Sequence, residues 1–226
     1  MREGPRPLLL LLPLVAALGG CSLLQSASVQ AEALAKGKRS ALRETEVELL
    51  TGLFGESLRT GDLKLLFIPA SAPGAAGTTL QNLIVLRWDG DPEDDEHRGS
   101  PGFRELLAHE ATHSWQFQHR GSEYMAESLL EQGFHHIVSE GDRTAAYTYE
   151  LDEQTRFLSL GVEQQAAFVE DIVRSTHGKA PRRCATLEAL GGEEAFRALG
   201  EVVLARDVRA LPAPLLRQEV ISGAVE

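Results

Sequence analysis

Apolar residues recur along the chain with two different periods, which predicts a mixed fold. Between Glu44 and Leu58 they fall at helical spacing, and Gly55 is a stop signal for that helix. The runs 62–70 and 82–88 are short and rich in Leu, Ile, Val and Phe, and the small-residue stretch SAPGAAGTT separates them. This arrangement predicts one helix followed by two strands with a loop between them.

Helical periodicity dominates the rest of the chain. Ser100 and Pro101 form an N-cap and first-turn pair, and the pattern stays helical as far as Gly121. Three further stretches have the same periodicity: 122–140, 159–176 and 191–205. The order of elements predicts an α+β fold that is mainly helical, with a small sheet near the N-terminus and helices after it.

The first 21 residues, MREGPRPLLLLLPLVAALGGC, have the organisation of a secretory signal. A basic start is followed by the apolar run Leu8–Leu18 and then by small residues before a cysteine. The apolar run is shorter than the ~20 residues that a membrane-spanning helix needs. Residues 1–21 are therefore predicted to be a signal peptide that is removed.

The ending Leu18-Gly19-Gly20-Cys21 resembles the lipobox of bacterial lipoproteins. The resemblance implies that Cys21 becomes the first residue of the mature chain and carries acyl chains that hold it on a membrane. By the same resemblance, Ser22 favours the outer membrane of a Gram-negative cell, with the protein facing the periplasm. The alternative is an ordinary secreted protein cut near Ala17 or Gly20.

Residues 22–40 are small and polar, as expected for a tether, and residues 41–226 are predicted to form the folded domain. If Cys21 is lipidated, Cys184 is the one remaining cysteine, so the mature chain has no internal disulfide. Its stability must then come from a hydrophobic core, and a chain of about 200 residues is long enough to bury one.

The charge balance narrows the choice of partners. The chain has 22 Lys and Arg against 33 Asp and Glu, a net charge of −11, and removal of the signal leaves 20 basic and 32 acidic residues. Such a surface argues against a nucleic-acid or anionic-lipid partner. The most acidic stretch, residues 89–100, lacks the ligand spacing of a calcium loop and is predicted to be a solvated turn.

The segment LLAHEATHSWQFQH carries the candidate chemistry. His109 and His113 are one helical turn apart, so both imidazoles can reach one ion, and Glu110 is placed to hold a water against that ion. This is the arrangement of zinc hydrolases, and it predicts Zn2+ as the cofactor. Leu106, Leu107, Trp115 and Phe117 flank the motif, which favours a buried helix.

Catalytic zinc needs a third protein ligand, and the sequence offers several. The short H-E-x-x-H-x-x-G-x-x-H form is not matched, because Gln116 stands where that form has glycine. A glutamate on a later helix is therefore expected. The candidates are Glu127, Glu131 and Glu163, with Glu123 as a weaker choice.

The order of these segments resembles the metallopeptidase domain found with Rhs and VgrG proteins of contractile injection and type VI secretion systems, and more loosely the zincin domain of extracellular injection systems. The matching pieces are TEVELLTGLFGESL, the two strands, LLAHEATHSWQFQH, AAYTYEL and VEQQAAFVED, which together cover about residues 44–172. The resemblance implies that His109 and His113 are zinc ligands, that Glu110 is the general base and that Glu163 is the third ligand. Residues 175–226 have no counterpart in it.

Further residues near these motifs are candidates for supporting roles. Glu163 begins a helical run, and Gln164, Gln165 and Asp171 are polar residues predicted to orient the ligands. Tyr147 and Tyr149 are the phenols predicted to donate to the oxyanion of a transition state.

These residues predict a membrane-tethered zinc metallopeptidase of the gluzincin type, acting on peptides or proteins in the cell envelope, with Glu110 moving the proton. The substrate can add as a strand to the small sheet, for which segment 82–88 is the expected edge. Two alternatives stay open: a zinc-stabilised binding or assembly module without turnover, and a lipoprotein whose motif binds no metal.

Overall fold

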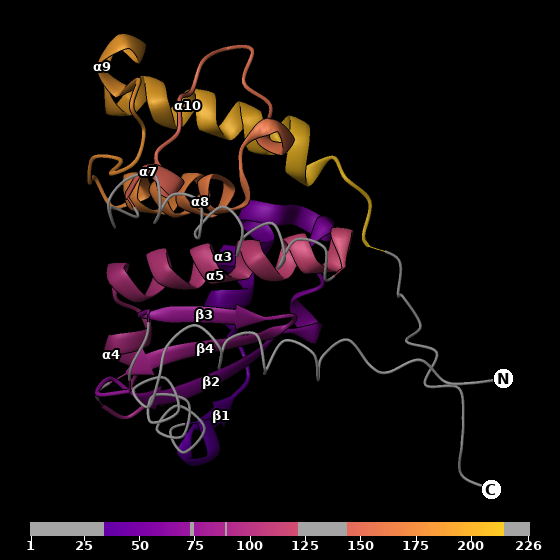
Figure 1. Ribbon diagram of the computed structural model, residues 1–226, viewed down its shortest axis with the longest axis vertical. Helices are drawn as coiled ribbons and strands as arrows, with labels where there is room; N and C mark the ends of the chain where they lie inside the picture. Colours follow the sequence, from indigo (N-terminus) through magenta and orange to yellow (C-terminus); the bar gives the residue numbers. More distant parts are fainter. Residues whose placement is uncertain (1–33, 73–74, 89, 122–143, 215–226) are drawn as a thin grey trace, which may run out of the picture.

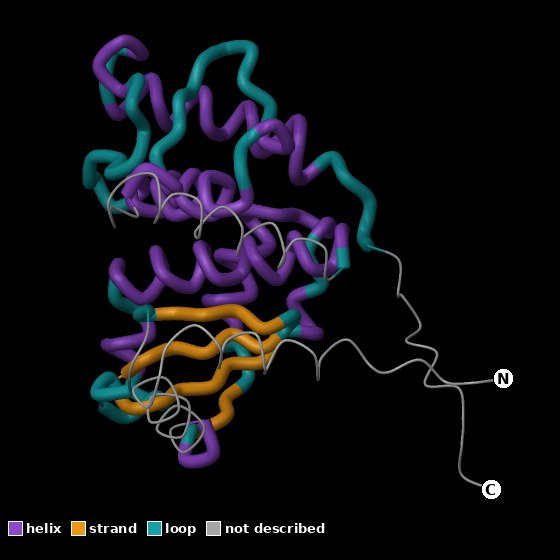
Figure 2. The backbone as a smooth tube through the Cα atoms, viewed as in Figure 1, coloured by secondary structure: helices purple, strands orange, loops and turns teal. Residues whose placement is uncertain are grey.

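Helices are stacked in layers on one face of a small sheet (Figure 1). The computed structural model describes residues 34–72, 75–88, 90–121 and 144–214. The sheet is at one end, and α5 (Pro101–Arg120) crosses it beside α3 (Glu44–Phe54). Next come α8 (Val162–Thr176) and then α10 (Glu193–Leu204). Figure 2 shows the strands gathered in one part of the molecule, so the predicted α+β class is confirmed.

The sheet has four strands in the order β1-β2-β4-β3. They are β1 (Lys38–Ser40), β2 (Lys64–Pro69), β3 (Gly77–Leu80) and β4 (Leu83–Trp88). β2 and β4 are parallel, whereas β1 and β3 are antiparallel to their neighbours. The two strands predicted from the sequence are therefore the central pair of a larger sheet.

Two strands lie where none was expected. β3 occupies the end of the stretch predicted to be a loop, and β1 lies at the end of the predicted tether. β3 is a strand because its residues alternate between buried and exposed, and because Gln81, at a φ of 60°, starts a two-residue turn back onto β4. The prediction that segment 82–88 forms the sheet edge was wrong, since β3 covers that side of β4.

Helix α5 forms as predicted because both its ends carry strong signals. The hydroxyl of Ser100 accepts a hydrogen bond from the backbone N–H of Phe103, Pro101 starts the first turn, and Gly121 ends the helix at a positive φ of 69°. α5 lies between the sheet and α8, so its middle is buried on both sides. Its apolar residues, including Leu107 and Trp115, belong to the main core.

That core runs through the sheet and all the helical layers. The ring of Trp115 on α5 lies 5.5 Å from that of Phe157, which lies 5.9 Å from that of Phe168 on α8, and this ring in turn lies 6.3 Å from that of Phe196 on α10. A second, smaller cluster occupies the other face of the sheet: Leu66, Ile68, Ala72 and Val85. Among the described residues, no helix combines the length and apolar character needed to span a bilayer.

Shorter elements connect these layers. They are the 3-10 turns η2 (Gly55–Ser57), η3 (Thr60–Asp62) and η4 (Phe157–Ser159), the short helices α4 (Asp95–Arg98), α7 (Thr144–Tyr147) and α9 (Leu187–Leu190), and the π-helical turn η5 (Ala205–Arg209). The first helix of the domain and the two C-terminal helices predicted from the sequence are confirmed by α3, α8 and α10. The predicted helix at 122–140 lies outside the described residues.

A buried ion pair connects the start of the domain to the segment that precedes α5. Arg98 donates from Nε to Glu46 Oε1 at 2.6 Å and from Nη2 to the carbonyl oxygen of Ala41 at 3.0 Å. The side chains of Arg98 and Glu46 are only 1% and 3% exposed. Glu46 also accepts the backbone N–H of Arg43, so one carboxylate fixes the start of α3 and the position of α4 together.

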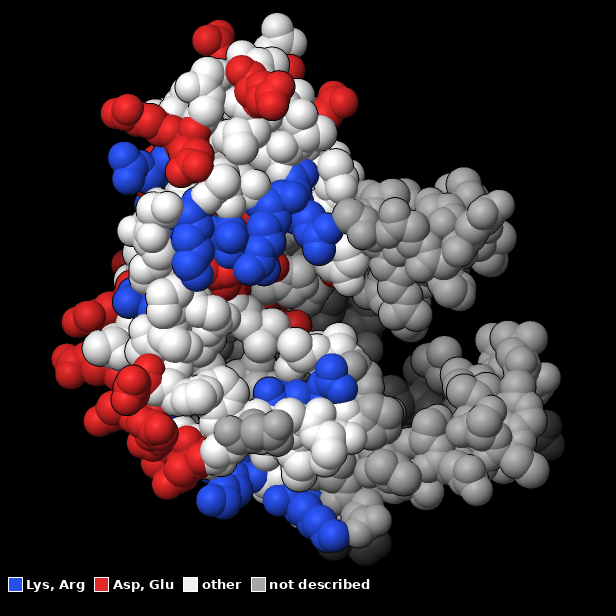
Figure 3. All heavy atoms as spheres, turned by 90° about the vertical axis from the view of Figure 1, so that its left-hand side faces the viewer, with Lys and Arg blue, Asp and Glu red and all other residues white. Residues whose placement is uncertain are grey.

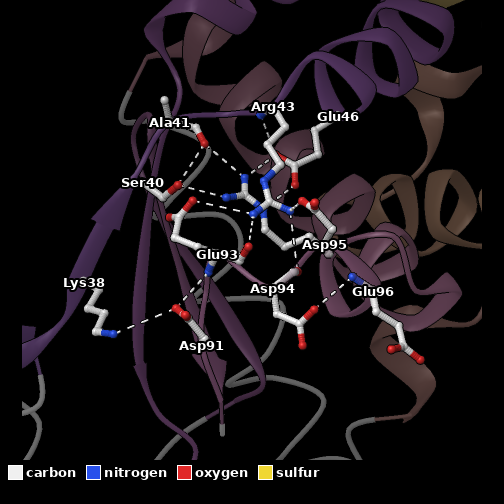
Figure 4. A network of polar contacts seen from close by, with 11 residues as sticks. Lys38, Ser40, Ala41, Arg43, Glu46, Asp91, Glu93, Asp94, Asp95 and Glu96 are labelled. Carbon is white, nitrogen blue, oxygen red and sulfur yellow. Dashed lines mark hydrogen bonds and ion pairs between the residues drawn. The ribbon is translucent and has the colours of Figure 1, made fainter.

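The acidic segment beside this pair is more ordered than the predicted solvated turn (Figure 4). It contains α4, whose N-cap Asp94 accepts the backbone N–H of Glu96 at 3.0 Å. The guanidinium of Arg43 donates to the carbonyl oxygen of Glu93 at 2.6 Å and pairs with Asp95 at 2.7 Å. Arg43, which directly precedes α3, therefore supplies positive charge to the carboxylates of this segment.

We expect Arg98→Met to lower the free energy of unfolding by about 3–5 kcal/mol, because it leaves the Glu46 carboxylate buried without its partner. Urea denaturation measures this loss. Lys38→Met is the matched control, since Lys38 and Asp91 form a pair whose side chains are 70% and 67% exposed. Its expected cost is about 0–1 kcal/mol. Equal losses in the two variants would contradict the prediction.

Candidate metal centre

Three side chains from two helices meet between α5 and α8. His109 and His113 come from α5, and Glu163 comes from the first turn of α8. Oxygen Oε2 of Glu163 lies 3.8 Å from Nε2 of His109 and 3.5 Å from Nε2 of His113. Among the described residues this is the group of side chains that can hold a metal ion.

The spacing and chemistry of this group fit a tetrahedral metal ion. Zinc bonds of about 2.0–2.2 Å to nitrogen and oxygen place neighbouring ligand atoms about 3.3–3.6 Å apart. The Glu163 side chain is only 2% exposed, and its carboxylate faces two imidazole nitrogens. A buried carboxylate is costly without a positive partner, and a cation at this point would supply one.

Both histidines are held with Nε2 directed to Glu163. Nδ1 of His109 lies 3.1 Å from Oε2 of Glu170, which can only accept when it is ionised, so Nδ1 carries the proton. The Gln116 side chain, three residues after His113, fixes the other ring, because its Oε1 lies 2.8 Å from Nδ1 of His113. When each ring is neutral, its proton therefore stays on Nδ1, and the lone pair of Nε2 can bind a metal ion.

The orientation of Gln116 follows from its other contacts. Its Nε2 donates to the carbonyl oxygen of Val162 at 2.9 Å and to Oε1 of Gln165 at 2.9 Å. Both amide hydrogens are thus used, which leaves Oε1 to accept from His113. Gln165 in turn donates to the carbonyl oxygen of Leu160. The His113 ring is positioned by a chain of amides that is anchored to the backbone at the start of α8.

Electrostatics in the site favour positive charge. Burial acts to lower the pKa of His113, but the hydrogen bond and charge of Glu163, followed by the charge of Glu110, raise it to about 9. Burial acts to raise the pKa of Glu170, but its hydrogen bond to His109 together with the charges of His109, Arg182 and Arg183 lowers the pKa. The site therefore attracts protons in the same place where it can bind a cation.

Glu110 lies on the side of α5 that faces the sheet. The hydroxyl of Thr79, on β3, lies 2.8 Å from Oε2 of Glu110 and 2.9 Å from its carbonyl oxygen. A Cβ at Gly77 would lie only 2.5 Å from Oε1 of Glu110, so this strand can approach the carboxylate only with glycine there. β3 thus encloses the carboxylate next to the two histidines.

The two candidate tyrosines differ in their surroundings. The ring of Tyr147, at the end of α7, lies 6.0 Å from the ring of His109. Tyr149 is 2% exposed, and its hydroxyl donates to Oδ2 of Asp171 at 2.9 Å. Burial and the neighbouring Asp171 carboxylate raise the pKa of Tyr149 well above its usual value. The structure therefore places Tyr147 beside the ligands and Tyr149 in the core.

The other predicted supporting residues divide in the same way. Gln165 acts on His113 through Gln116, as described above. Gln164 instead accepts the backbone N–H of Gly161 at the start of α8, and Asp171 accepts backbone N–H groups of a neighbouring loop. The alternative ligands Glu123, Glu127 and Glu131, and the predicted lipidation site Cys21, lie outside the described residues.

Several residues of the site were missed by the sequence analysis. Glu170 follows Glu163 by seven residues, two helical turns along the same face of α8, so helical spacing alone could have indicated it. Gln116 follows His113 by about one turn, so helical spacing could have indicated it as well. Thr79 and Gly77 had no such signal, because their strand was not predicted.

No family model and no curated protein sequence matches this chain. Among solved structures, the effector domain of Pseudomonas aeruginosa VgrG2b is similar, with a TM-score of 0.49 and 21% sequence identity. The match covers 81% of this chain and 96% of that domain. It is a partial likeness in the arrangement of the backbone, to a VgrG effector domain, and carries no information on catalysis by this chain.

We expect Glu163→Ala to abolish metal binding at micromolar concentration, because it removes a ligand. Glu170→Gln, which removes the negative charge opposite Nδ1 of His109 and leaves the three ligands unchanged, should weaken affinity by about 10–100-fold. Metal content after dialysis and competition with a chromophoric chelator measure both effects. The exposed Glu194, in the first turn of α10, gives the control Glu194→Ala. Unchanged zinc content in Glu163→Ala would show that the ligand set is different.

Metal affinity should rise with pH. His113, with a pKa of about 9, is protonated at pH 7 and must give up that proton to bind a metal ion. The association constant should therefore increase by about tenfold per pH unit between pH 7 and 9 and then level off. Titration calorimetry with cobalt(II) in buffers of different ionisation enthalpy reports the released proton. An association constant independent of pH over this range would be inconsistent with the raised pKa.

Proposed function

We propose that this chain is a zinc-dependent metallopeptidase. The observation that carries the proposal is the convergence of His109, His113 and Glu163 on one point, with Glu110 directly after His109 on α5. Two imidazoles and one carboxylate are a ligand set used by catalytic zinc, which keeps its fourth position for water or substrate. When bound, the zinc ion would polarise the scissile carbonyl and lower the pKa of a water molecule.

In this proposal Glu110 moves the proton. Its carboxylate would accept a proton from the attacking water and deliver it to the leaving amine. Thr79 and the close backbone of Gly77 restrict the orientation of this carboxylate. The carboxylate would therefore need little movement to reach a water molecule beside the metal ligands. Tyr147, whose ring adjoins that of His109, would be the phenol that donates to the developing oxyanion.

The position of β3 suggests how a peptide would be aligned. Among the described strands, β3 is the outermost on its side of the sheet, and its residues Gly77 and Thr79 adjoin Glu110. A substrate that paired with β3 as an added strand would pass the general base and then the metal ligands. Backbone pairing of this kind binds a peptide with little dependence on its side chains.

We also propose a cellular location for this activity, from the lipobox-like sequence that ends at Cys21. A lipid on Cys21 would hold the domain on the outer membrane facing the periplasm, where peptides and proteins of the cell envelope are the available substrates. The net charge of −11 agrees with a protein that does not use nucleic acid as a partner.

We expect Glu110→Gln to retain one zinc ion per chain and to lower the rate of peptide hydrolysis by about 10²–10⁴-fold. The substitution keeps the size and the contact to Thr79 but removes the base. Hydrolysis of a mixed peptide library, followed by mass spectrometry, measures the rate. A wild-type chain that binds zinc but cleaves no peptide would favour the alternative of a zinc-stabilised binding module.

A further inference from the structure

Basic side chains gather beside the metal centre although the chain is acidic overall. Figure 3 shows them at mid-height of the molecule, at the level of α8, with acidic atoms among them. Contacts bring together four basic residues from the end of α8 and the loop that follows it: Arg174, Lys179, Arg182 and Arg183.

Three of the four are committed to acidic partners. Glu105, which is 3% exposed, accepts from Arg174 at 3.1 Å and from Lys179 at 3.0 Å. Arg182 lies 3.8 Å from the same carboxylate and 3.7 Å from Glu170. These ion pairs hold the loop against α5 and α8.

Arg183 has a different environment. Its guanidinium lies 5.7 Å from the centre of the Tyr147 ring, and that ring adjoins His109. The side chain is half-buried, and its charge acts on the Glu170 carboxylate, whose pKa it helps to lower. Its guanidinium nevertheless forms no hydrogen bond or ion pair with any residue in the described ranges. A guanidinium has five N–H donors in a planar fork, so its binding capacity is left for a group from outside the fold.

The backbone around Arg183 is fixed on both sides. The N–H groups of Arg182 and Arg183 donate to the two carboxylate oxygens of Asp171 at 2.7 and 2.9 Å. The carbonyl oxygen of Arg183 accepts the N–H of Tyr149 at 3.1 Å. Asp171 is itself held by the hydroxyl of Tyr149. Arg183 is therefore presented by a rigid loop, and little ordering is needed when it binds.

We propose that Arg183 binds a carboxylate of the substrate next to the metal centre, which makes this a site for acidic peptides. The proposal rests on the function proposed above. The planar guanidinium matches a carboxylate in bidentate geometry, and the Tyr147 face keeps it in place. Because an extended peptide advances about 3.3–3.6 Å per residue, the carboxylate belongs to a residue one to three positions from the scissile bond. An Asp or Glu side chain and the chain's own C-terminus both supply this group.

The test measures binding separately from turnover. Fluorescent peptides of a neutral background, each with one Asp or Asn scanned along the sequence and with a free or amidated C-terminus, are titrated against the zinc-loaded full chain carrying Glu110→Gln. We expect the Asp peptide to bind at least tenfold more tightly than its Asn counterpart at one position, and Arg183→Gln to remove that difference. Arg183→Lys should restore only part of it, since it keeps the charge without the fork.

Lys179→Gln is the matched control, because it removes the same charge from the same loop at a residue already paired with Glu105. Its preference for the acidic peptide should stay within about twofold of that of the parent chain. A preference that depended only on the free C-terminus would assign the carboxylate to the chain end. Equal losses in Lys179→Gln and Arg183→Gln, or no preference in the parent chain, would overturn the proposal.

The two proposals fail in different ways. One outcome is that the wild-type chain cleaves peptides in a zinc-dependent way and yet shows no preference for acidic peptides that Arg183→Gln abolishes. That result would contradict the acidic-peptide site and leave the proposed peptidase activity standing. Carboxylate-dependent binding that requires Arg183, in a wild-type chain that cleaves none of the peptides, would leave an acidic-peptide binding site without catalysis.

Discussion

The cost of burying the Glu163 carboxylate governs the arrangement of the helical layers. Its side chain is 2% exposed between α5 and α8, where a negative charge needs compensation. The compensation comes from α5, which places His109 and His113 opposite it. Antiparallel packing of the two helices then brings Glu170 to His109 and Gln116 to Val162, so the same contact that joins the layers also orients the imidazoles.

Helix α5 separates two kinds of support. On its α8 side the ligands are held by carboxylate and amide groups, and on its sheet side Glu110 is held by Thr79 and the backbone at Gly77. In the proposed mechanism, metal binding and proton transfer would thus be supported by different layers of the fold. A change in β3 can alter the position of Glu110 without touching a ligand, and a change in α8 can loosen a ligand without moving Glu110.

Periodicity was enough to locate the helices, because α5 has strong signals at both ends and both α5 and α8 have apolar residues at helical spacing. It failed for β3, since GTTL is short, small and only weakly apolar, and it becomes a strand through pairing with β4. Helical spacing predicted His109 and His113 as candidate ligands, and a family resemblance pointed to Glu163. The position of Arg183 could not be predicted, because it depends on a loop that is held by Asp171, 12 residues away in sequence.

The contacts of Arg43 have a consequence for handling the protein. The acidic segment around α4 draws its positive charge from this arginine, which is part of the chain and cannot be extracted. Elsewhere in the described ranges, His109, His113 and Glu163 are the group able to hold an ion. If the proposed metal ion is bound there, a chelating reagent should remove it and leave the corner formed by α3 and α4 folded. A loss of the proposed activity could then be assigned to loss of the metal ion and not to unfolding.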